Sequence, residues 1–314
     1  MIISASRRTD IPTYYSDWFF NRIKEGFVFV RNPINARQIS RVKLTPDVVD
    51  GIVFWTKNPV PMIDRLNELR DYMFYFQFTI TSYGKDIEPN VPQKNSDVLS
   101  AFQEVSNIVG ADRVIWRYDP ILLNEKYTFD YHVRAFTKIA GELQGHTKKV
   151  TISFIDTDYR NLKSNIEALK LVDFPMAMQR ELASLLANIA KEHGLSIDTC
   201  AEKIDLHECG IEQARCIDDR LFSKLLSSPL DVEKDKSQRL ECGCISSVDI
   251  GMYNTCMNGC LYCYANYSKG AIIGNHAKHN PQSPLLFGEV GMDDKVTDRT
   301  AKVYRNSQMD LDGM

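Results

Sequence analysis

Short apolar runs alternate with helical patterns along most of this chain. The runs are rich in β-branched and aromatic residues, and each is followed by a polar cluster; they span 1–6, 27–32, 51–59, 74–81, 113–120, 149–157, 195–202 and 245–251. Several are almost continuously hydrophobic, which is typical of parallel strands buried on both faces. The pattern therefore predicts eight strands, most of them inside a parallel sheet.

The segments between these runs have helical periodicity. In 17–26, Trp18, Phe19 and Ile23 fall on one side, and Gly26 is expected to end the helix. Further helices are expected at 59–72, at 96–110 with Ser96 as the N-cap, at 161–173 and at 178–194. Alternating strands and helices predict a parallel α/β fold, and eight strands favour a (β/α)8 TIM-type barrel over an open doubly wound sheet. We expect the barrel at 1–266, including a cysteine-rich segment at 200–263, with an extended surface segment at 267–314.

Polar residues follow most of the predicted strands. In a barrel the carboxyl ends of the strands share one mouth, so they would converge there; the charged ones are Arg7, Arg8, Lys57, Arg117 and Asp119. Any single cluster could equally be a turn or a helix cap. The loop 82–95 carries two prolines and a glycine and is expected to cover the mouth as a lid. His276 and His279 have the spacing of metal ligands, although a solvated loop is the preferred interpretation.

Composition narrows the functional class only slightly. The chain has 314 residues, 44% of them hydrophobic and 25% charged, as in ordinary globular proteins. A net charge of -3 argues against general coating of nucleic acids, but not against a local basic site. The N-terminus does not read as a signal peptide and no apolar stretch is long enough to span a membrane. We therefore expect a cytoplasmic protein with no membrane partner, in which thiols stay reduced.

All eight cysteines lie between Cys200 and Cys263, and this asymmetry predicts metal binding. The densest group is "CMNGCLYC", in which Cys256, Cys260 and Cys263 are spaced C-x3-C-x2-C. Three thiolates do not supply the four ligands of a structural zinc site. They can hold three irons of a cubane cluster and leave the fourth iron open, and thiolates are ligands that iron–sulfur clusters prefer. Gly259 allows the tight loop that this requires.

This motif resembles the signature of the radical S-adenosylmethionine (radical SAM) superfamily, C-x3-C-x-Φ-C, with Tyr262 at the aromatic position. The continuation "YCYAN" and the segments "FWTKNP", "FTIT…DIEPNVP" and "RYDPIL" are similar to the spore photoproduct lyase-like branch, over about half the chain. The whole arrangement also resembles a bacterial family with a radical-SAM-like cysteine cluster at its C-terminal end.

The resemblance implies that Cys256, Cys260 and Cys263 bind a [4Fe–4S] cluster whose open iron chelates S-adenosylmethionine. An electron from a donor such as flavodoxin or ferredoxin then cleaves the sulfonium, and the 5′-deoxyadenosyl radical abstracts hydrogen from an unknown substrate. The side chains expected to bind S-adenosylmethionine or an anionic substrate are Tyr262, Lys57, Arg117, Asp119, Arg7 and Arg8. By analogy with the branch, a nucleotide or nucleic acid is a candidate substrate.

One departure from the family concerns the order of the elements. In radical SAM enzymes the cysteine loop follows the first barrel strand, whereas here it follows the last predicted strand, 245–251. Because a closed ring can be cut elsewhere and rejoined, we hypothesise a circular permutation. The strand at 245–251 would then lie beside the strand at 1–6.

The other cysteines suggest a second centre. Cys200, Cys216, Cys242 and Cys244 would form a tetrathiolate site for an auxiliary [4Fe–4S] cluster or zinc, while Cys209 fits a loop thiol. Buried free cysteines are also common and inert, so plain core packing is the competing interpretation.

Two further functional classes stay open. A non-enzymatic iron–sulfur or zinc protein, with a sensing or binding role, would need no S-adenosylmethionine pocket. A metal-dependent hydrolase would show histidines and carboxylates at strand ends, whereas the six histidines lie mostly off the strands.

Overall fold

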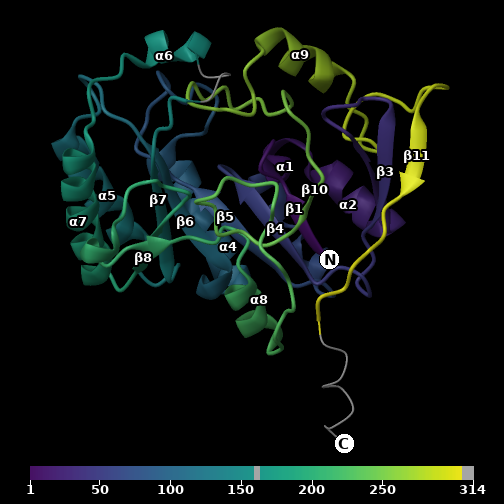
Figure 1. The fold of residues 1–314 in the computed structure, drawn as a ribbon, viewed down its shortest axis with the longest axis horizontal. Coiled ribbons are helices and arrows are strands. Elements are labelled where there is room, and N and C mark those ends of the chain that lie inside the picture. Colours follow the sequence, from purple (N-terminus) through teal and green to yellow (C-terminus); the bar gives the residue numbers. More distant parts are fainter. Residues whose placement is uncertain (159–162, 306–314) are drawn as a thin grey trace, which may run out of the picture.

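The computed structural model describes residues 1–158 and 163–305, and its centre is one parallel sheet (Figure 1). Eight strands pair side by side in the order β10-β1-β4-β5-β6-β7-β8-β9. They are β1 (Ile2–Ala5), β4 (Gly51–Thr56), β5 (Phe74–Thr79), β6 (Val114–Ile121), β7 (Lys149–Phe154), β8 (Ser196–Thr199), β9 (Glu212–Gln213) and β10 (Val248–Asp249). Every neighbouring pair is parallel, which confirms the predicted α/β class.

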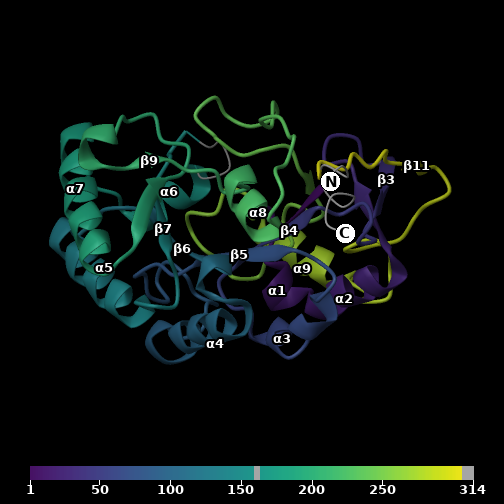
Figure 2. The ribbon, with the colours of Figure 1, turned by 90° about the horizontal axis from the view of Figure 1, so that it is seen from below.

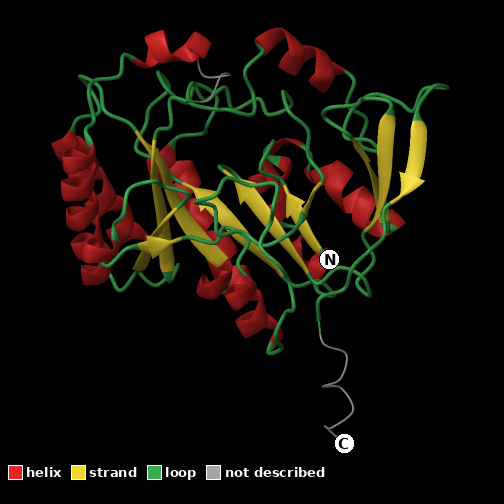
Figure 3. Ribbon diagram, in the orientation of Figure 1, coloured by secondary structure: helices red, strands yellow, loops and turns green. Residues whose placement is uncertain are grey.

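Helices cover one face of the curved sheet (Figures 2 and 3). The α-helices are α1 (Ile11–Tyr14), α2 (Ser16–Glu25), α3 (Val60–Ile63), α4 (Leu99–Val109), α5 (Phe129–Leu143), α6 (Lys163–Leu169), α7 (Met176–Glu192), α8 (Asp219–Leu226) and α9 (Lys269–Ala277). Short 3-10 turns are η1 (Leu66–Leu69), η3 (Ala111–Arg113) and η5 (His207–Cys209), and η2 (Lys94–Val98) is a π-helical turn. The expected helix at 59–72 is therefore split into α3 and η1. Ser96 is not an N-cap, because it lies inside η2; residues 161 and 162 of another expected helix lie outside the described residues.

The opposite face of the sheet is covered by α8 and the loops around it. Phe222 of α8 packs with Ile2, Val53 and Tyr75, side chains that point away from the main helical layer. Gly51 is needed at this contact, because a Cβ there would lie 2.1 Å from the Phe222 ring. The two faces thus have separate cores, and the sheet is buried on both sides as its hydrophobic runs predict.

The prediction of a strand from 27–32 in the main sheet is wrong. β2 (Phe27–Arg31) instead pairs antiparallel with β3 (Gln38–Lys43), and β11 (Lys295–Asp298) adds parallel to β3 in a separate three-stranded sheet. Only Val28 of β2 is buried, and a strand with one buried face is typical of an antiparallel hairpin.

The strand order shows whether the sheet closes into the predicted (β/α)8 barrel. β10, the last strand of the sheet along the chain, pairs with the first, with Ile3 opposite Val248. Among the described residues no pairing joins β9 to β10, so the sheet is open where a (β/α)8 barrel would close. What is established is a mixed α/β fold with a large parallel sheet.

The segment after 267 is not simply extended, since it begins with α9. It then packs on α2, where the Trp18 indole Nε1 donates to the carbonyls of Ser283 (2.9 Å) and Leu285 (3.1 Å). His279 Nδ1 lies 2.6 Å from the Leu286 carbonyl, and His276 lies in the last turn of α9. In the described part of the chain, every helix is too short or too polar to cross a membrane.

Candidate functional site

The cysteine loop 256–263 lies at the carboxyl end of β10, against the residues that follow β1. The Asp249 carboxylate of β10 accepts from Ser4 Oγ (2.7 Å), Ser6 Oγ (2.6 Å) and the backbone N–H of Arg7 (2.8 Å). These bonds join the first and the last strand of the sheet along the chain, which are neighbours at one edge of the sheet. The hypothesis that 245–251 lies beside 1–6 matches this arrangement.

The polar residues after β1 also hold the loop itself. Tyr15 OH donates to the Thr255 carbonyl (2.6 Å), and Tyr14 OH donates to Asn258 Oδ1 (2.8 Å). Asn258 Nδ2 in turn donates to the buried Asp10 carboxylate at 3.2 Å. The loop is therefore fixed by three side chains from the other end of the sequence.

The three thiols of the loop are close enough to affect one another. Burial, with added repulsion from Asp10 and the other two thiols, raises the pKa of Cys256 well above its usual value. Burial likewise raises the pKa of Cys260 to about 12. Asn266 Nδ2 donates to Cys263 Sγ at 3.5 Å. Thiols with raised pKa values in a buried loop become thiolates only beside a strong positive charge, so a bound cationic centre fits this donor set.

The side chains around the three thiols are not arranged as a ready metal site. Among the described residues, no group of three or more His, Cys, Asp or Glu side chains has an arrangement that could hold a metal ion. The fit to an iron–sulfur cluster therefore rests on the chemistry of the donors, which are three neighbouring soft thiol ligands. Two of the thiols are almost fully buried, and Gly259 between them adopts the left-handed backbone conformation (φ +69°).

A buried carboxylate, Glu88, organises the charged residues beside the loop. Its Oε1 accepts from Lys57 Nζ (2.8 Å), from Thr81 Oγ1 (2.9 Å) and from the Tyr262 hydroxyl, and its Oε2 pairs with Lys94. Glu88 is 1% exposed, so these partners replace its water shell. Lys57 also lies 5.5 Å from the centre of the Tyr262 ring.

This network stays charged near neutral pH. Although burial opposes ionisation, Lys57 and Lys94 lower the pKa of Glu88 to about 2. The Glu88 carboxylate raises the pKa of Lys57 against the cost of its burial. Burial lowers the pKa of Lys94 to about 8. Two ammonium groups face one carboxylate here, which leaves net positive charge beside the thiols.

The segment 82–95 lies on the cysteine loop. Asn90 donates its backbone N–H to the Asn258 carbonyl (3.2 Å) and its side-chain Nδ2 to the Met257 carbonyl (2.6 Å). Leu261 donates its N–H to the Ile87 carbonyl at 3.0 Å. The segment that the sequence marks as a covering loop therefore contacts the loop that carries the thiols.

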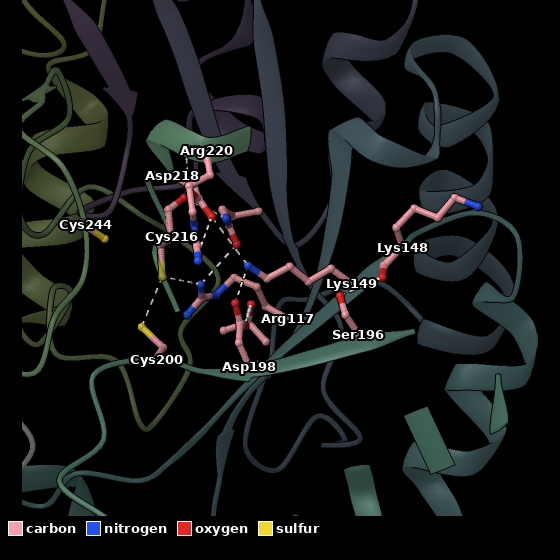
Figure 4. Close-up of polar contacts among 12 residues, drawn as sticks. Arg117, Lys148, Lys149, Ser196, Asp198, Cys200, Cys216, Asp218, Arg220 and Cys244 are labelled. Carbon is pink, nitrogen blue, oxygen red and sulfur yellow. Dashed lines mark hydrogen bonds and ion pairs between the residues drawn. The ribbon is translucent and has the colours of Figure 1, made fainter. Parts of the chain in front are cut away.

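A second group of thiols forms at the ends of β8 and β9 (Figure 4). Cys200 Sγ and Cys216 Sγ are 3.3 Å apart, and Cys216, Cys242 and Cys244 are buried in one cluster against which Cys200 packs. The Arg117 Nη1 donates to Cys216 Sγ at 2.9 Å. Cys200, Cys216, Cys242 and Cys244 are the four cysteines grouped in the sequence analysis, and we call them the four-thiol cluster. Cys209 is separate, with its Sγ 3.8 Å from the Arg180 carbonyl.

The remaining predicted site residues divide between the two groups. Lys57 and Tyr262 lie by the cysteine loop, whereas Arg117 and Arg7 face the four-thiol cluster. Asp119 binds the Arg117 guanidinium, with 3.1 Å between Oδ1 and Nε, and its charge also reaches Lys57 and Cys200.

Arg8 stands apart from both groups. Its guanidinium carbon lies 5.1 Å from the Tyr253 ring centre, and its Nη1 is 3.4 Å from the Gly251 carbonyl. The predicted single mouth is thus two neighbouring groups linked electrostatically through Asp119.

Sequence reasoning missed three carboxylates of this region. Glu88 and Asp10 lie by the cysteine loop; Glu202 lies at the end of β8, where burial raises its pKa to about 7. Asp10 caps α1 by accepting from the Thr13 N–H, which makes it look like an ordinary N-cap in the sequence. The best available signals were positional, since Glu88 falls in the predicted covering loop and Glu202 follows a predicted strand.

Comparison with known proteins gives a family. A model described as "Domain of unknown function (DUF1848)" matches residues 2–265. The chain belongs to the DUF1848 family. No curated protein and no solved structure matches it. The part of this DUF1848 protein that matches contains the whole parallel sheet, the cysteine loop and the four-thiol cluster.

Proposed function

We propose that this DUF1848 protein is a radical SAM-type enzyme whose centre is held by Cys256, Cys260 and Cys263. The observation that carries the proposal is the position of the cysteine loop: it follows β10, which pairs with β1, at the carboxyl end of a parallel sheet. That is where α/β folds bind ligands and perform chemistry. In this proposal the sheet is a permuted and incomplete form of the radical SAM barrel.

The residues near the loop have defined parts in the proposal. A bound [4Fe–4S] cluster with S-adenosylmethionine would supply a 5′-deoxyadenosyl radical for hydrogen abstraction from the substrate. The chain's own task is to hold the three thiols, to exclude water and to supply positive charge. Lys57, held by Glu88, offers an ammonium to an anionic group such as the carboxylate of S-adenosylmethionine. Tyr262 packs beside Lys57 and shields the thiols from solvent.

Partners and location follow from the same proposal. A reduced flavodoxin or ferredoxin would deliver the electron, and such donors work in the cytoplasm, where cysteines stay reduced. Arg7, Arg117 and Asp119 would face the substrate side. Resemblance to the spore photoproduct lyase-like branch makes a nucleotide or nucleic acid the first substrate class to test.

Anaerobic reconstitution tests the proposal. The protein is loaded with iron and sulfide, reduced, and incubated with S-adenosylmethionine, and 5′-deoxyadenosine is measured by chromatography. We expect the product with the unmodified chain and with Cys209→Ala, a thiol outside both groups, but not with Cys260→Ala. A loaded cluster that gives no product under several reductants would instead favour a non-enzymatic iron–sulfur protein with a sensing or binding role.

A further inference from the structure

The four-thiol cluster is assembled from three separate segments of the chain. Cys200 follows β8, Cys216 follows β9, and Cys242 and Cys244 come from the loop before β10. The Sγ atoms of Cys200 and Cys216 are 3.3 Å apart, and Cys242 and Cys244 are buried in the same cluster as Cys216. Three separate segments of the chain thus bring four thiols into one small cluster, with two of the sulfurs in direct contact.

The backbone around the cluster is held in place from the sheet. Tyr75 OH and Gln77 Nε2, both buried on β5, donate to the Cys216 carbonyl at 2.8 Å each. Gly243 passes so close to the neighbouring chain that a Cβ would lie 2.8 Å from the Ala214 carbonyl oxygen. The turn Cys242-Gly243-Cys244 therefore packs directly against the segment that carries Cys216.

The sulfurs receive the hydrogen bonds and positive charge that thiolate ligands need. The Ile217 N–H donates to Cys244 Sγ at 3.4 Å, and Arg117, 5% exposed, donates to Cys216 Sγ at 2.9 Å. Arg7 adds a second guanidinium whose charge interacts with Cys244 and Cys216. Donors of this kind around metal-bound sulfur tune and orient the ligands.

We infer that Cys200, Cys216, Cys242 and Cys244 form a mononuclear tetrathiolate site that binds zinc. A tetrahedral site with Zn–S bonds of about 2.3 Å has neighbouring sulfurs about 3.8 Å apart. The 3.3 Å contact between Cys200 and Cys216 must therefore open by about half an ångström to admit one ion. A cubane of four irons and four sulfides needs its ligands at the corners of a much larger tetrahedron, so the short contact between Cys200 Sγ and Cys216 Sγ favours a single ion.

The site shares no cysteine with the proposed catalytic centre, so the experiment can test the two separately. Cys256, Cys260 and Cys263 are all replaced by Ala, so that any metal still bound belongs to the four-thiol cluster. Zinc, iron and sulfide are measured in the purified triple variant by elemental and colorimetric analysis. We expect about one zinc per chain, no sulfide, and release of the metal on titration with a mercurial reagent. Cobalt loading of the same variant should give the intense visible absorption of a tetrahedral cobalt–thiolate centre.

Further substitutions in the triple variant locate the ligands. Adding Cys242→Ser should lower the zinc content several-fold, whereas adding Cys209→Ser should leave it unchanged. Should the serine variant not fold, the cobalt spectrum of the triple variant still decides the question. Iron with equivalent sulfide would replace the inference with a second cubane. A folded triple variant with no metal and no cobalt–thiolate spectrum, or with a Cys200–Cys216 disulfide formed under reducing purification, would refute it.

Discussion

Replacing Glu88 by glutamine tests whether the charged network beside the cysteine loop is organised by one carboxylate. The substitution keeps the size of the side chain but removes its charge. It leaves the ammonium groups of Lys57 and Lys94 buried without their counter-ion, since both contact Glu88 directly. Breaking a buried ion pair by removing one partner costs about 3–5 kcal/mol. We therefore expect Glu88→Gln to lower the free energy of unfolding by about 3 kcal/mol at pH 7.

The loss should depend on pH in a direction that the lysine sets. The pKa of Lys94 is already lowered by burial to about 8 and should fall further without Glu88. A base whose folded pKa lies below its unfolded value is destabilising at low pH, because the unfolded chain binds the proton more tightly. Above pH 8 Lys94 is neutral in both folded proteins, so its part of the difference disappears. The deficit of the variant should thus shrink between pH 7 and pH 9.

Urea unfolding followed by circular dichroism at the two pH values measures these differences. Glu104→Gln, at an exposed position of α4, is the matched control and should change stability by less than about 0.5 kcal/mol. If the free energy of unfolding of Glu88→Gln at pH 7 differs from that of the parent by less than about 0.5 kcal/mol, the network does not depend on the carboxylate. A deficit that grows toward pH 9 would contradict the assigned role of Lys94.

Three other outcomes can be checked on the purified protein. Burial lowers the pKa of His132 to about 4, so the folded state resists its protonation; stability should fall as the pH drops from 6.5 to 4, by up to about 3 kcal/mol, and His132→Gln should flatten that part of the unfolding profile. Gly51→Ala should lower stability by about 1–3 kcal/mol because its Cβ meets Phe222, and a second substitution, Phe222→Leu, should recover part of the loss in a double-mutant cycle. Asp249→Asn weakens the bonds between β10 and the end of β1, so limited proteolysis should cut the cysteine loop faster than in the parent, and equal cleavage rates would argue against this anchor.

The hydrophobic runs were sufficient to predict most of the sheet, because a strand buried on both faces has an unmistakable apolar pattern. Seven of the eight predicted strands are in it; 27–32 was misplaced because an apolar run does not reveal which partner it pairs with. β9 has two residues and leaves no pattern to detect. The absence of pairing between β9 and β10 in the described residues could not be foreseen, since an apolar run does not show whether the two ends of a sheet meet.

For the candidate site, the short spacing of the cysteines is visible in the sequence, whereas the carboxylates have no such signal. The four cysteines grouped from the sequence lie in or against one buried cluster in the structure. Glu88 sits alone in an irregular loop, and only the fold brings Lys57 and Tyr262 to it from positions 31 residues before and 174 residues after it. The residues next to Glu88 in the sequence do not indicate these distant partners, so Glu88 could not be identified as the centre of the charged network.

The junction between β1 and β10 has a consequence for how the protein is made. Its hydrogen bonds join residues more than 240 positions apart. β1, the first strand to be synthesised, therefore cannot pair with β10 until almost the whole sheet has been synthesised. The cysteine loop is anchored by the same early residues and cannot take its final shape until it has itself been synthesised. A metal centre in the cysteine loop can therefore form only after translation has passed residue 263. A fragment that stops before β10 would contain all the cysteines of the four-thiol cluster but none of the three in the cysteine loop.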